Sequence, residues 1–405
     1  MANITRLDQS TINQIAAGEV IDRPASVVKE LMENAIDAGA TAVTVEIREG
    51  GISFIRITDN GCGIEGEDIP LAFLRHTTSK IKSVEDLLTV KSLGFRGEAL
   101  SSIAAVAQVE LITKTAGSLT GYRYVIEGGE EKKLEEVGTP EGTTIIVRNL
   151  FYHTPARKKF LKSAATEGSY IGDLVQRMAL SHPEISLRLI VNNQTRLHTA
   201  GNHNLKDIIY GIYGKELTRE LIPVEGTLFC GSLRGYIGKA SVSKGNRTWE
   251  NYFINGRYIK SNIIGKALEE AYQGIMMQHR YPFCVLHLSI DPAYIDVNVH
   301  PSKMEIRFQQ GEQLYQELLE QIGGALRGKE MIPSFTVGAE EKKEKPQPLP
   351  VRAPEPFERH RMEQERQTEH AEHLMAPGGQ PDWLAAGSQT GPAAEQQDGI
   401  LSAGT

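Results

Sequence analysis

Cysteine is scarce in this 405-residue chain, and long apolar runs are missing from it. It has three cysteines, which are widely spaced and form no CxxC pair: Cys62, Cys230 and Cys284. This pattern argues against a disulfide framework and a thiolate zinc site, and it predicts a reducing, cytoplasmic setting. No charged region followed by an apolar core occurs at the start, and no apolar run reaches the length of about 18 residues that a membrane helix needs. We therefore expect neither export nor membrane insertion.

An excess of positive charge and a phosphate loop are also absent. The formal net charge is −7, so any contact with nucleic acid must come from a local basic patch. No GxxxxGKS or GxxxxGKT string occurs, so a bound nucleotide would have to be held in another way. Hydrophobic residues make up 40% of the chain, which is sufficient for the cores of two ordinary domains.

Composition and periodicity divide the chain into three parts. Half of the 18 prolines lie in 333–405, a segment poor in Val, Ile and aromatic residues, so we expect a disordered linker or tail there. Apolar alternation predicts an α+β sandwich with helices over one face at 1–218, and a second α+β domain at 219–332. We expect helices at 26–38, 164–181 and 312–326, and strands at 43–48, 53–58, 109–113, 122–126, 143–148, 185–191, 227–237, 252–259, 283–290, 295–299 and 304–308.

The segment PASVVKELMENAIDAGA is expected to form a helix with two unlike faces. Pro24 and Ser26 are typical of a helix start, and Gly39 is typical of the position just after a helix end. At about 100° per residue, one face is apolar and the other is polar. The apolar face comprises Val28, Leu31, Met32, Ala35 and Ile36, and the polar face comprises Glu30, Glu33, Asn34 and Asp37.

The polar face has two interpretations. An amphipathic helix commonly exposes such a face to water without any further role. Asn34 and Asp37 favour a site instead, because neither residue type forms helices well and an exposed face more often carries Lys, Glu, Gln or Ala. Carboxylates with a side-chain amide supply hard oxygen ligands and a general base, which a magnesium-nucleotide site requires.

A second candidate element is FIRITDNGCGIEG, in which a strand ends at Asp59 and enters a glycine-rich turn. Gly61, Gly63 and Gly66 match GxGxxG, but no helix starts within them and no parallel crossover surrounds them, so we reject a dinucleotide-binding fingerprint. A carboxylate at a strand end can accept a hydrogen bond from an exocyclic amine, and glycines let the backbone approach a flat base. An ordinary turn is the alternative.

Two further regions carry candidate nucleotide contacts. The string SLGFRGEALSSIAAVAQVELI predicts a loop running into a helix, whose first N–H groups form an anion site. The preceding LRHTTSKIKSVEDL is polar and suits a loop that folds over phosphates. In PEGTTIIVRNLF, Gly142 and Thr143 open a strand, for which a structural turn is the commoner explanation.

Taken in order, these signals resemble those of the MutL family of DNA mismatch repair proteins. That family lies within the GHKL ATPase superfamily, with the gyrase B subunit, Hsp90 and the sensor histidine kinases. The similarity covers about residues 1–332, and its most specific strings are INQIAAGEVIDRPASVVKELMENAIDAGA, DNGCGI, RHTTSKI, LGFRGEALSSI, FYHTPARKKFL and DVNVHPSKMEIRF. The resemblance implies a Bergerat-type ATPase sandwich, then a ribosomal S5 domain 2-like transducer domain, with ATP and Mg²⁺ as cofactors.

The resemblance also implies roles for individual residues. Glu30 would be the general base that activates the attacking water, and Asn34 would ligate the magnesium ion. Asp59 would accept the adenine amino group, with Thr143 supporting it through a water. Lys303 would reach the terminal phosphate from the second domain and report the nucleotide state. The other expected nucleotide-binding residues are Asp37, Gly61, Gly63, Thr78, Ser79, Lys80, Gly94, Phe95, Arg96, Gly97, Glu98, Ala99 and Leu100, most of them in or beside a lid.

By the same resemblance, ATP would act as a switch. Its binding would order the lid and let two copies dimerise through their ATPase domains, and hydrolysis would release them. The implied partners are the MutS mismatch-recognition protein, DNA, and a downstream helicase or endonuclease, in the cytoplasm and at the nucleoid during repair, with no membrane. The candidate DNA-binding residues are Arg157, Lys158, Lys159 and Arg257, for which solvated surface is the alternative.

The chain departs from the family in one respect. MutL chains normally continue past a linker into a C-terminal domain that holds the dimer together and, in many bacteria, carries a metal-dependent endonuclease. No DQHAxxERxxYE-like string occurs here, so we expect neither nicking activity nor constitutive dimerisation. A scaffold that binds DNA and proteins without significant hydrolysis is the main alternative. A topoisomerase ATPase subunit and a sensor kinase share the nucleotide motifs but have no further support in the sequence.

Overall fold

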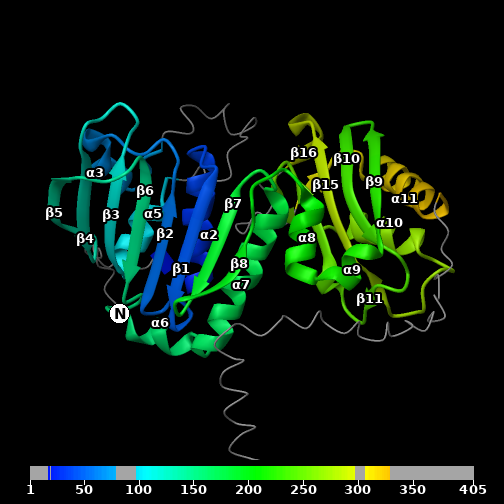
Figure 1. Ribbon diagram of the computed structural model, residues 1–405, viewed down its shortest axis with the longest axis horizontal. Helices are drawn as coiled ribbons and strands as arrows, with labels where there is room; N and C mark the ends of the chain where they lie inside the picture. The colour runs from blue at the N-terminus through cyan, green and yellow to red at the C-terminus, as the bar shows by residue number, and fades with distance from the viewer. Residues whose placement is uncertain (1–16, 19, 79–96, 297–305, 329–405) are drawn as a thin grey trace, which may run out of the picture. The chain divides into compact units, whose positions relative to one another are not determined.

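The computed structural model describes residues 17–18, 20–78, 97–296 and 306–328 (Figure 1). Contacts within the chain group the described residues into one compact unit, which falls within Met1–Pro333. The predicted domains 1–218 and 219–332 thus fall within one unit, and the predicted tail at 333–405 lies outside the described residues. Among the described helices, none has both the length and the apolar character needed to cross a membrane.

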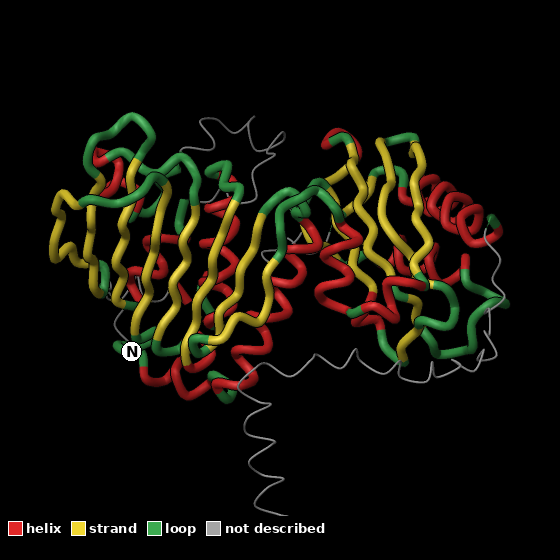
Figure 2. The backbone as a smooth tube through the Cα atoms, in the orientation of Figure 1, coloured by secondary structure: helices red, strands yellow, loops and turns green. Residues whose placement is uncertain are grey.

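The first part of the described chain forms an eight-stranded sheet with helices over one face (Figures 1 and 2). Its strand order is β5-β4-β3-β6-β2-β1-β7-β8, and neighbours are antiparallel except for the parallel pair β1 and β7. This arrangement confirms the expected α+β sandwich. The strands are β1 Ala42–Arg48, β2 Phe54–Asp59, β3 Gln108–Lys114, β4 Gly121–Glu127, β5 Glu130–Val137, β6 Gly142–Arg148, β7 Ser186–Val191 and β8 Gln194–His198.

Apolar alternation decides which face of this sheet the helices cover. Val45 and Ile47 in β1 are buried and lie opposite the buried Ile57 and Ile55 in β2. These side chains pack beneath α2, which contacts both strands. The helices of this part are α2 Pro24–Asp37, α3 Ile69–Ala72, α5 Ala99–Val106, α6 Pro155–Phe160 and α7 Ala164–Ser181.

Helix α2 follows directly from its sequence. Pro24 occupies its first turn, where a missing N–H costs nothing because that group would have no intrahelical partner. The helix ends at Asp37, and Gly39 just beyond it adopts a φ of 74°, which only glycine reaches without strain. Its buried residues are Pro24, Val27, Val28, Leu31, Met32, Glu33 and Ala35. The sheet therefore holds α2 by its apolar face and fixes the direction of its polar face.

A five-stranded sheet forms the second part, in the order β13-β12-β15-β10-β9. Strands β12 and β15 are parallel and are joined by a crossover that contains α10, while the other pairs are antiparallel. Helices α10 and α11 pack on each other, and α11 packs on β9. Before this sheet come α8 Leu205–Tyr213, which contacts α7 and β8, and α9 Lys215–Arg219. The elements of the second part are β9 Leu221–Leu228, β10 Gly231–Gly238, β11 Ser243–Lys244, β12 Glu250–Ile254, β13 Arg257–Ile259, α10 Asn262–Ala271, β14 Tyr281–Pro282, β15 Cys284–Ile290, β16 Ile295–Asp296, β17 Arg307–Phe308 and α11 Gly311–Arg327.

Strands β12 and β13 form a tight hairpin whose two central residues are Asn255 and Gly256. Both have positive φ, 47° and 80°, as a two-residue turn of type I′ requires. The amide of Asn255 donates to the carbonyl of Ile290 at 2.8 Å and accepts from the N–H of Ile290 at 2.9 Å. The turn is thereby attached to the end of β15.

Two strand predictions in this part are wrong. Residues 227–237 are not one strand, because the chain reverses at Phe229 and Cys230 between β9 and β10. Residues 252–259 are likewise β12, a turn and β13. In both cases apolar residues continue up to the turn on each side, so alternation alone did not reveal the reversal. The Asn-Gly pair was the local signal for the second hairpin.

Candidate functional site

The polar face of α2 is partly buried. Glu33 is 9% exposed, and Glu30, Asn34 and Asp37 are intermediate in exposure. A polar face that only contacts water would be exposed, and this one is not. Carboxylates taken out of water need partners. The polar face of α2 is therefore not a fully solvated surface.

Lys29 is one partner of this acidic face. Its Nζ lies 2.9 Å from Oε1 of Glu33 and 3.3 Å from Oε1 of Glu30. Burial alone would lower the pKa of Lys29, but the two carboxylates outweigh it and raise the pKa. Lys29 therefore stays charged and is shared between the two acids.

Asp59 lies at the end of β2, opposite Thr143 in β6. Its Oδ1 accepts a hydrogen bond from the backbone N–H of Gly61 at 2.9 Å. Burial raises the pKa of Asp59, against the opposing effect of backbone hydrogen bonds from Gly61 and Thr143. The backbone thus fixes this carboxylate at a strand end, with acceptor capacity left for another donor.

The glycine-rich turn after Asp59 packs against the carboxyl end of α2. The N–H of Cys62 donates to the carbonyl of Ala38 at 3.0 Å. A Cβ on Gly61 would lie 2.9 Å from the Cβ of Ala38, and one on Gly63, whose φ is 73°, would lie 2.3 Å from the carbonyl oxygen of Lys114. Only glycine allows this approach. The two candidate elements therefore meet on the helix-covered side of the sheet.

Thr113 joins three parts of this region, although sequence reasoning did not single it out. It is fully buried at the end of β3, and its Oγ1 accepts from the N–H of Ile64 at 2.9 Å. The same hydroxyl donates to the carbonyl of Gly142 at 3.1 Å and lies 3.1 Å from Oγ1 of Thr143. The signal in the sequence was the position of Thr113, two residues after Leu111 in the same strand. Alternation places both side chains on the buried face, where an apolar residue is expected.

The two predicted lid segments approach each other where the structure describes them. Nδ1 of His76 lies 3.0 Å from Oε1 of Glu98. Gly97 has a φ of 60°, and a Cβ there would lie 2.2 Å from the carbonyl oxygen of Thr77. The described ends of the two segments, 75–78 and 97–100, are thus in contact.

Other expected lid residues have the following places. Thr78 is partly buried after this contact, and Ala99 and Leu100 form the start of α5, which packs on α2. The remaining predicted site residues lie outside the described residues: Ser79, Lys80, Gly94, Phe95, Arg96 and Lys303.

The candidate DNA residues do not share one environment. Lys158 and Lys159 are exposed on α6, while Arg157 is partly buried. The Arg157 guanidinium packs so closely on Gly18 that a Cβ there would lie 1.8 Å from its Nη2. Arg257, at the start of β13, is also partly buried. Of the four, the two lysines are the ones open to a polyanion.

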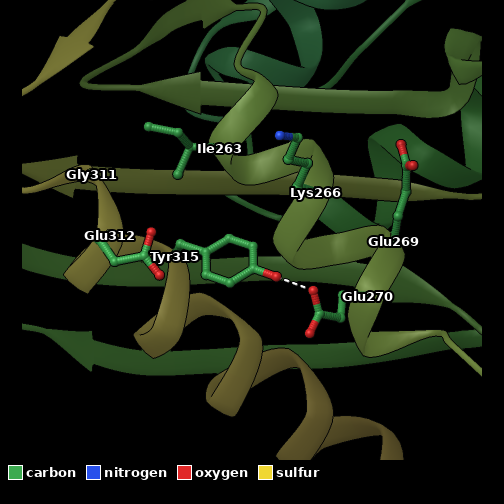
Figure 3. A pocket seen from close by; sticks show the side chains of 7 residues that line it. All are labelled: Ile263, Lys266, Glu269, Glu270, Gly311, Glu312 and Tyr315. Carbon is green, nitrogen blue, oxygen red and sulfur yellow. Dashed lines mark hydrogen bonds between the residues drawn. The ribbon is translucent and has the colours of Figure 1, made fainter.

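A separate groove lies between α10 and α11 (Figure 3). The hydroxyl of Tyr315 donates to the carboxylate of Glu270 across it. The residues that line it are Ile263, Lys266, Glu269, Glu270, Gly311, Glu312 and Tyr315. None of the predicted site residues is among them, so this groove is distinct from the region between α2 and β2.

Two protein families match separate parts of the chain. Residues 22–147 match the histidine kinase-, DNA gyrase B- and HSP90-like ATPases. Residues 209–327 match the C-terminal domain of DNA mismatch repair proteins. The predicted order, an ATPase sandwich followed by a second α+β domain, is confirmed.

Curated relatives of the chain are MutL proteins. It is 59% identical over 374 residues to the DNA mismatch repair protein MutL of Agathobacter rectalis, covering 91% of this chain and 57% of that protein. It is 45% identical over 340 residues to MutL of Clostridium botulinum, covering 84% of this chain and 50% of that protein. The chain thus spans little more than half the length of these relatives.

Solved structures agree with this relationship. The N-terminal domain of a DNA repair protein superposes with a TM-score of 0.66 at 25% identity, covering 78% of this chain and 98% of that one. The Aquifex aeolicus MutL ATPase domain complexed with ADP superposes with a TM-score of 0.52 at 28% identity, covering 67% of this chain and 94% of that one. The chain therefore belongs to the MutL family of DNA mismatch repair proteins, and its first sheet carries the ATPase fold of that family.

Proposed function

We propose that this chain binds ATP between the polar face of α2 and the turn after β2, hydrolyses it, and uses the cycle to coordinate mismatch recognition with downstream incision and unwinding. The observation that carries the proposal is the hydrogen bond from Cys62 to Ala38, which joins the two candidate elements. The ADP complex of the Aquifex aeolicus relative supports nucleotide binding by this fold.

Each proposed role suits the position of its residue. Asp59, held by backbone N–H groups, accepts the adenine amino group, and Thr143 opposite it supports that contact through a water. The carboxylate of Glu30 takes the proton of the attacking water. Glu30 lies on the same face of α2 as Asn34. The proposed general base and the proposed magnesium ligand are therefore held by one rigid helix.

The residues of α2 also fit a magnesium ion. Magnesium prefers oxygen donors and is commonly held by one or two protein ligands together with phosphate oxygens and water. The amide oxygen of Asn34 would hold it, and Asp37 lies one turn further on the same face. When bound, the ion would neutralise charge that develops on the phosphates.

The switch completes the proposal. ATP orders the lid around Thr78 and Gly97, Lys303 reaches the terminal phosphate, and two copies dimerise through their ATPase domains. The partners are MutS, DNA and a downstream helicase or endonuclease, in the cytoplasm. We place the boundary between ATPase and transducer domains at 218/219 and a disordered tail at 333–405.

DNA contact is proposed mainly at the exposed Lys158 and Lys159 of α6. Binding through lysines to phosphates is independent of sequence and falls with salt. Arg157 and Arg257 were predicted for the same role and stay predictions, although both guanidinium groups lie against other parts of the chain.

The test is Glu30→Ala in the purified chain. We expect turnover to fall by at least about a hundredfold, the scale of general base catalysis, while a non-hydrolysable ATP analogue still binds. Glu216→Ala, which removes a carboxylate that is 90% exposed, is the matched control and should leave turnover unchanged. A wild type that binds ATP and shows no turnover above the Glu30→Ala protein would favour the scaffold instead.

A second measurement tests the link between nucleotide and assembly. Size-exclusion mobility is compared with and without the same analogue. Earlier elution with the analogue supports ATP-driven dimerisation, and unchanged elution at saturating analogue contradicts it.

A further inference from the structure

Helices cover one face of the first sheet (Figure 2), and the opposite face, here called the open face, carries a group of arginines. Arg48 in β1 lies directly opposite Phe54 in β2, which lies opposite Arg148 in β6. Each of the three is adjacent in sequence to a buried residue of the helix-covered face, so alternation places it on the open face. The guanidinium carbons of Arg48 and Arg148 lie 5.0 Å and 5.9 Å from the centre of the Phe54 ring. Both cations therefore pack on the same aromatic side chain.

Two largely buried carboxylates hold these arginines from beneath. The first is Glu46 in β1, which accepts a hydrogen bond of 3.2 Å from Arg48 and a second one from Arg56 in β2. The Glu46 side chain is 7% exposed, whereas those of Arg48 and Arg56 are 53% and 44% exposed. Glu46 is thus covered by two guanidinium groups, and both groups contact water.

The second carboxylate is Glu110 in β3. It accepts hydrogen bonds from Arg123 in β4 at 2.6 Å and from Arg148 at 2.7 Å. Burial alone would raise the pKa of Glu110, but the two arginines outweigh it and lower the pKa, so this carboxylate is ionised at neutral pH. The Glu110 side chain is 13% exposed, and that of Arg148 is 43% exposed. The arrangement at Glu46 is therefore repeated at Glu110.

Positive charge is in excess on this part of the open face. One guanidinium group balances one carboxylate, and each of the two acids has two such partners. Arg188 in β7 adds a further exposed cation, opposite Thr44 of β1. The strands β7, β1, β2 and β6 thus present Arg188, Arg48, Arg56 and Arg148 to water, in a chain whose formal net charge is −7. A local excess of this kind attracts polyanions.

The excess does not extend over the whole sheet. Arg123 is shared between Glu110 and Glu135 of β5, to which it donates at 2.8 Å. Strand β5 carries four glutamates against two lysines, Lys132 and Lys133, and each lysine pairs with a glutamate. A polyanion would therefore be repelled at the β5 edge and attracted to the region of β1, β2 and β6.

Arg48 and Arg148 lie at the end of the sheet that borders α6. After Arg48 the chain turns, and a Cβ on Gly50 would lie 2.3 Å from the carbonyl oxygen of Ala164, the first residue of α7. The exposed Lys162 lies between α6 and α7. Arg148 is the last residue of β6, and the chain that follows it leads into α6. The lysines of α6 and the arginines of the open face therefore border the same end of the sheet.

We propose that the open-face arginines bind the phosphate backbone of the duplex DNA that also contacts the lysines of α6. These arginines are Arg48, Arg56 and Arg148. The inference rests on the proposed DNA contact of α6 and extends it to the open face. Guanidinium groups donate to phosphate oxygens through a planar pair of N–H groups. The acids beneath them and the aromatic ring restrict these side chains before binding, so less conformational entropy is lost when DNA binds. Contacts with phosphates read no base, so binding is independent of sequence.

The experiment measures the affinity of the purified chain for a labelled DNA duplex over a range of salt concentrations. The test variant is Arg48→Gln/Arg148→Gln, in which each of the two acids keeps one guanidinium partner. We expect affinity to fall about tenfold at about 0.1 M salt, and the slope of log affinity against log salt to decrease by about 1.8, or about 0.9 for each lost phosphate contact. Lys132→Gln/Lys133→Gln removes the same charge from the β5 edge and should change affinity by less than about twofold.

The wild type and a variant of α6 separate the inference from the proposed function. Unchanged affinity in the arginine variant, with weaker binding by Lys158→Gln/Lys159→Gln, overturns the inference alone and leaves the open face for an acidic protein surface. An equal loss in the β5 control also overturns the inference, because total charge would then explain the effect. Absence of DNA binding by the wild type overturns the proposed DNA contact and the inference together.

Two further readouts separate contact with DNA from damage to the fold. The arginine variant should bind the ATP analogue as the wild type does, because α2 lies on the opposite side of the sheet. Arg48→Lys/Arg148→Lys restores both charges and should recover the salt dependence of DNA binding. A salt slope that stays reduced in this lysine variant contradicts a contact with phosphates. A loss of DNA affinity matched by an equal loss of analogue affinity contradicts it as well.

Discussion

Asp59 and Thr143 lie directly opposite each other on β2 and β6, and the backbone N–H of Thr143 is one of two that hold the Asp59 carboxylate. Two strands from distant parts of the sequence therefore build one acceptor. The glycine-rich turn and the end of α2 close around the same point through Cys62 and Ala38. This is the geometry on which nucleotide recognition would depend.

Replacing Asp59 by Asn should weaken ATP binding without unfolding the protein. The charged acceptor contributes more than a neutral one, so we expect affinity to fall by about tenfold to a hundredfold, which corresponds to about 1.4–2.8 kcal/mol. Because burial disfavours the ionised form, the free protein should lose no stability. Calorimetric titration with an ATP analogue measures the first effect and thermal unfolding the second. Unchanged affinity would place adenine elsewhere.

Thr113→Val should destabilise the candidate site by removing buried hydrogen bonds at the end of β3. The variant keeps the shape of the side chain but leaves the N–H of Ile64 and the carbonyl of Gly142 without their hydroxyl partner. We expect a loss of about 1–3 kcal/mol in the free energy of unfolding, and weaker ATP binding. The control is Thr144, which follows Thr143 in β6 and whose hydroxyl donates a 3.1 Å hydrogen bond to the hydroxyl of Thr58 near solvent. Thr144→Val removes this bond and should lower the free energy of unfolding by less than about 0.5 kcal/mol. Equal losses in the two variants would deny Thr113 a special role.

Gly63→Ala should disrupt the turn after β2. Its positive φ disfavours alanine, and the new Cβ would lie 2.3 Å from a backbone oxygen that cannot rotate away. Together these effects should cost about 2 kcal/mol or more and lower ATP affinity. Gly117→Ala is the matched control, because its Cβ would meet nothing within 4 Å. Urea unfolding compares the two. A Gly63→Ala protein with wild-type stability and affinity would show that the turn adapts freely.

Glu250→Gln should change how stability depends on pH. Glu250 is 5% exposed, and burial raises its pKa to about 7, against a hydrogen bond of 2.8 Å from Tyr252. The folded protein thus holds this proton more tightly than the unfolded chain, so the wild type loses stability as pH rises from about 4.5 to about 7.

Glutamine does not titrate, so the stability of the Glu250→Gln variant should not fall as pH rises through this range. It should be more stable than wild type by on the order of 2 kcal/mol above pH 8, with a smaller difference at pH 5. Urea unfolding at the two pH values measures both. A difference of the same size at pH 5 and pH 8 would show that Glu250 does not titrate in this range.

The parts of the site that were predictable lie within single segments. Helix α2 shows both faces in its own periodicity, and Asp59 with its glycines marks a strand end in a few consecutive residues. The strands of the first sheet were found to within a few residues because each buries one face. Strands β5 and β8 were missed because they bury little: six residues of β5 are exposed, and only Leu197 is buried in β8.

The unpredicted features arise from packing between distant segments. The links of Thr113 depend on which strands become neighbours, and the sequence does not state that β3 lies beside β6. Arg257 was predicted to belong to a basic surface, whereas the fold leaves its side chain partly buried. His76 and Glu98 were predicted to lie in or beside one lid, but only the folded structure shows that their side chains contact each other.

Asn255 fastens the hairpin tip to Ile290, the last residue of the strand from which the chain runs on toward Lys303. The tip of the β12–β13 hairpin is therefore tied to the end of the strand that crosses the middle of the second sheet. Because the same turn also accepts a hydrogen bond from Ser181 at the end of α7, the hairpin and the end of β15 should separate from α7 together and not one after the other.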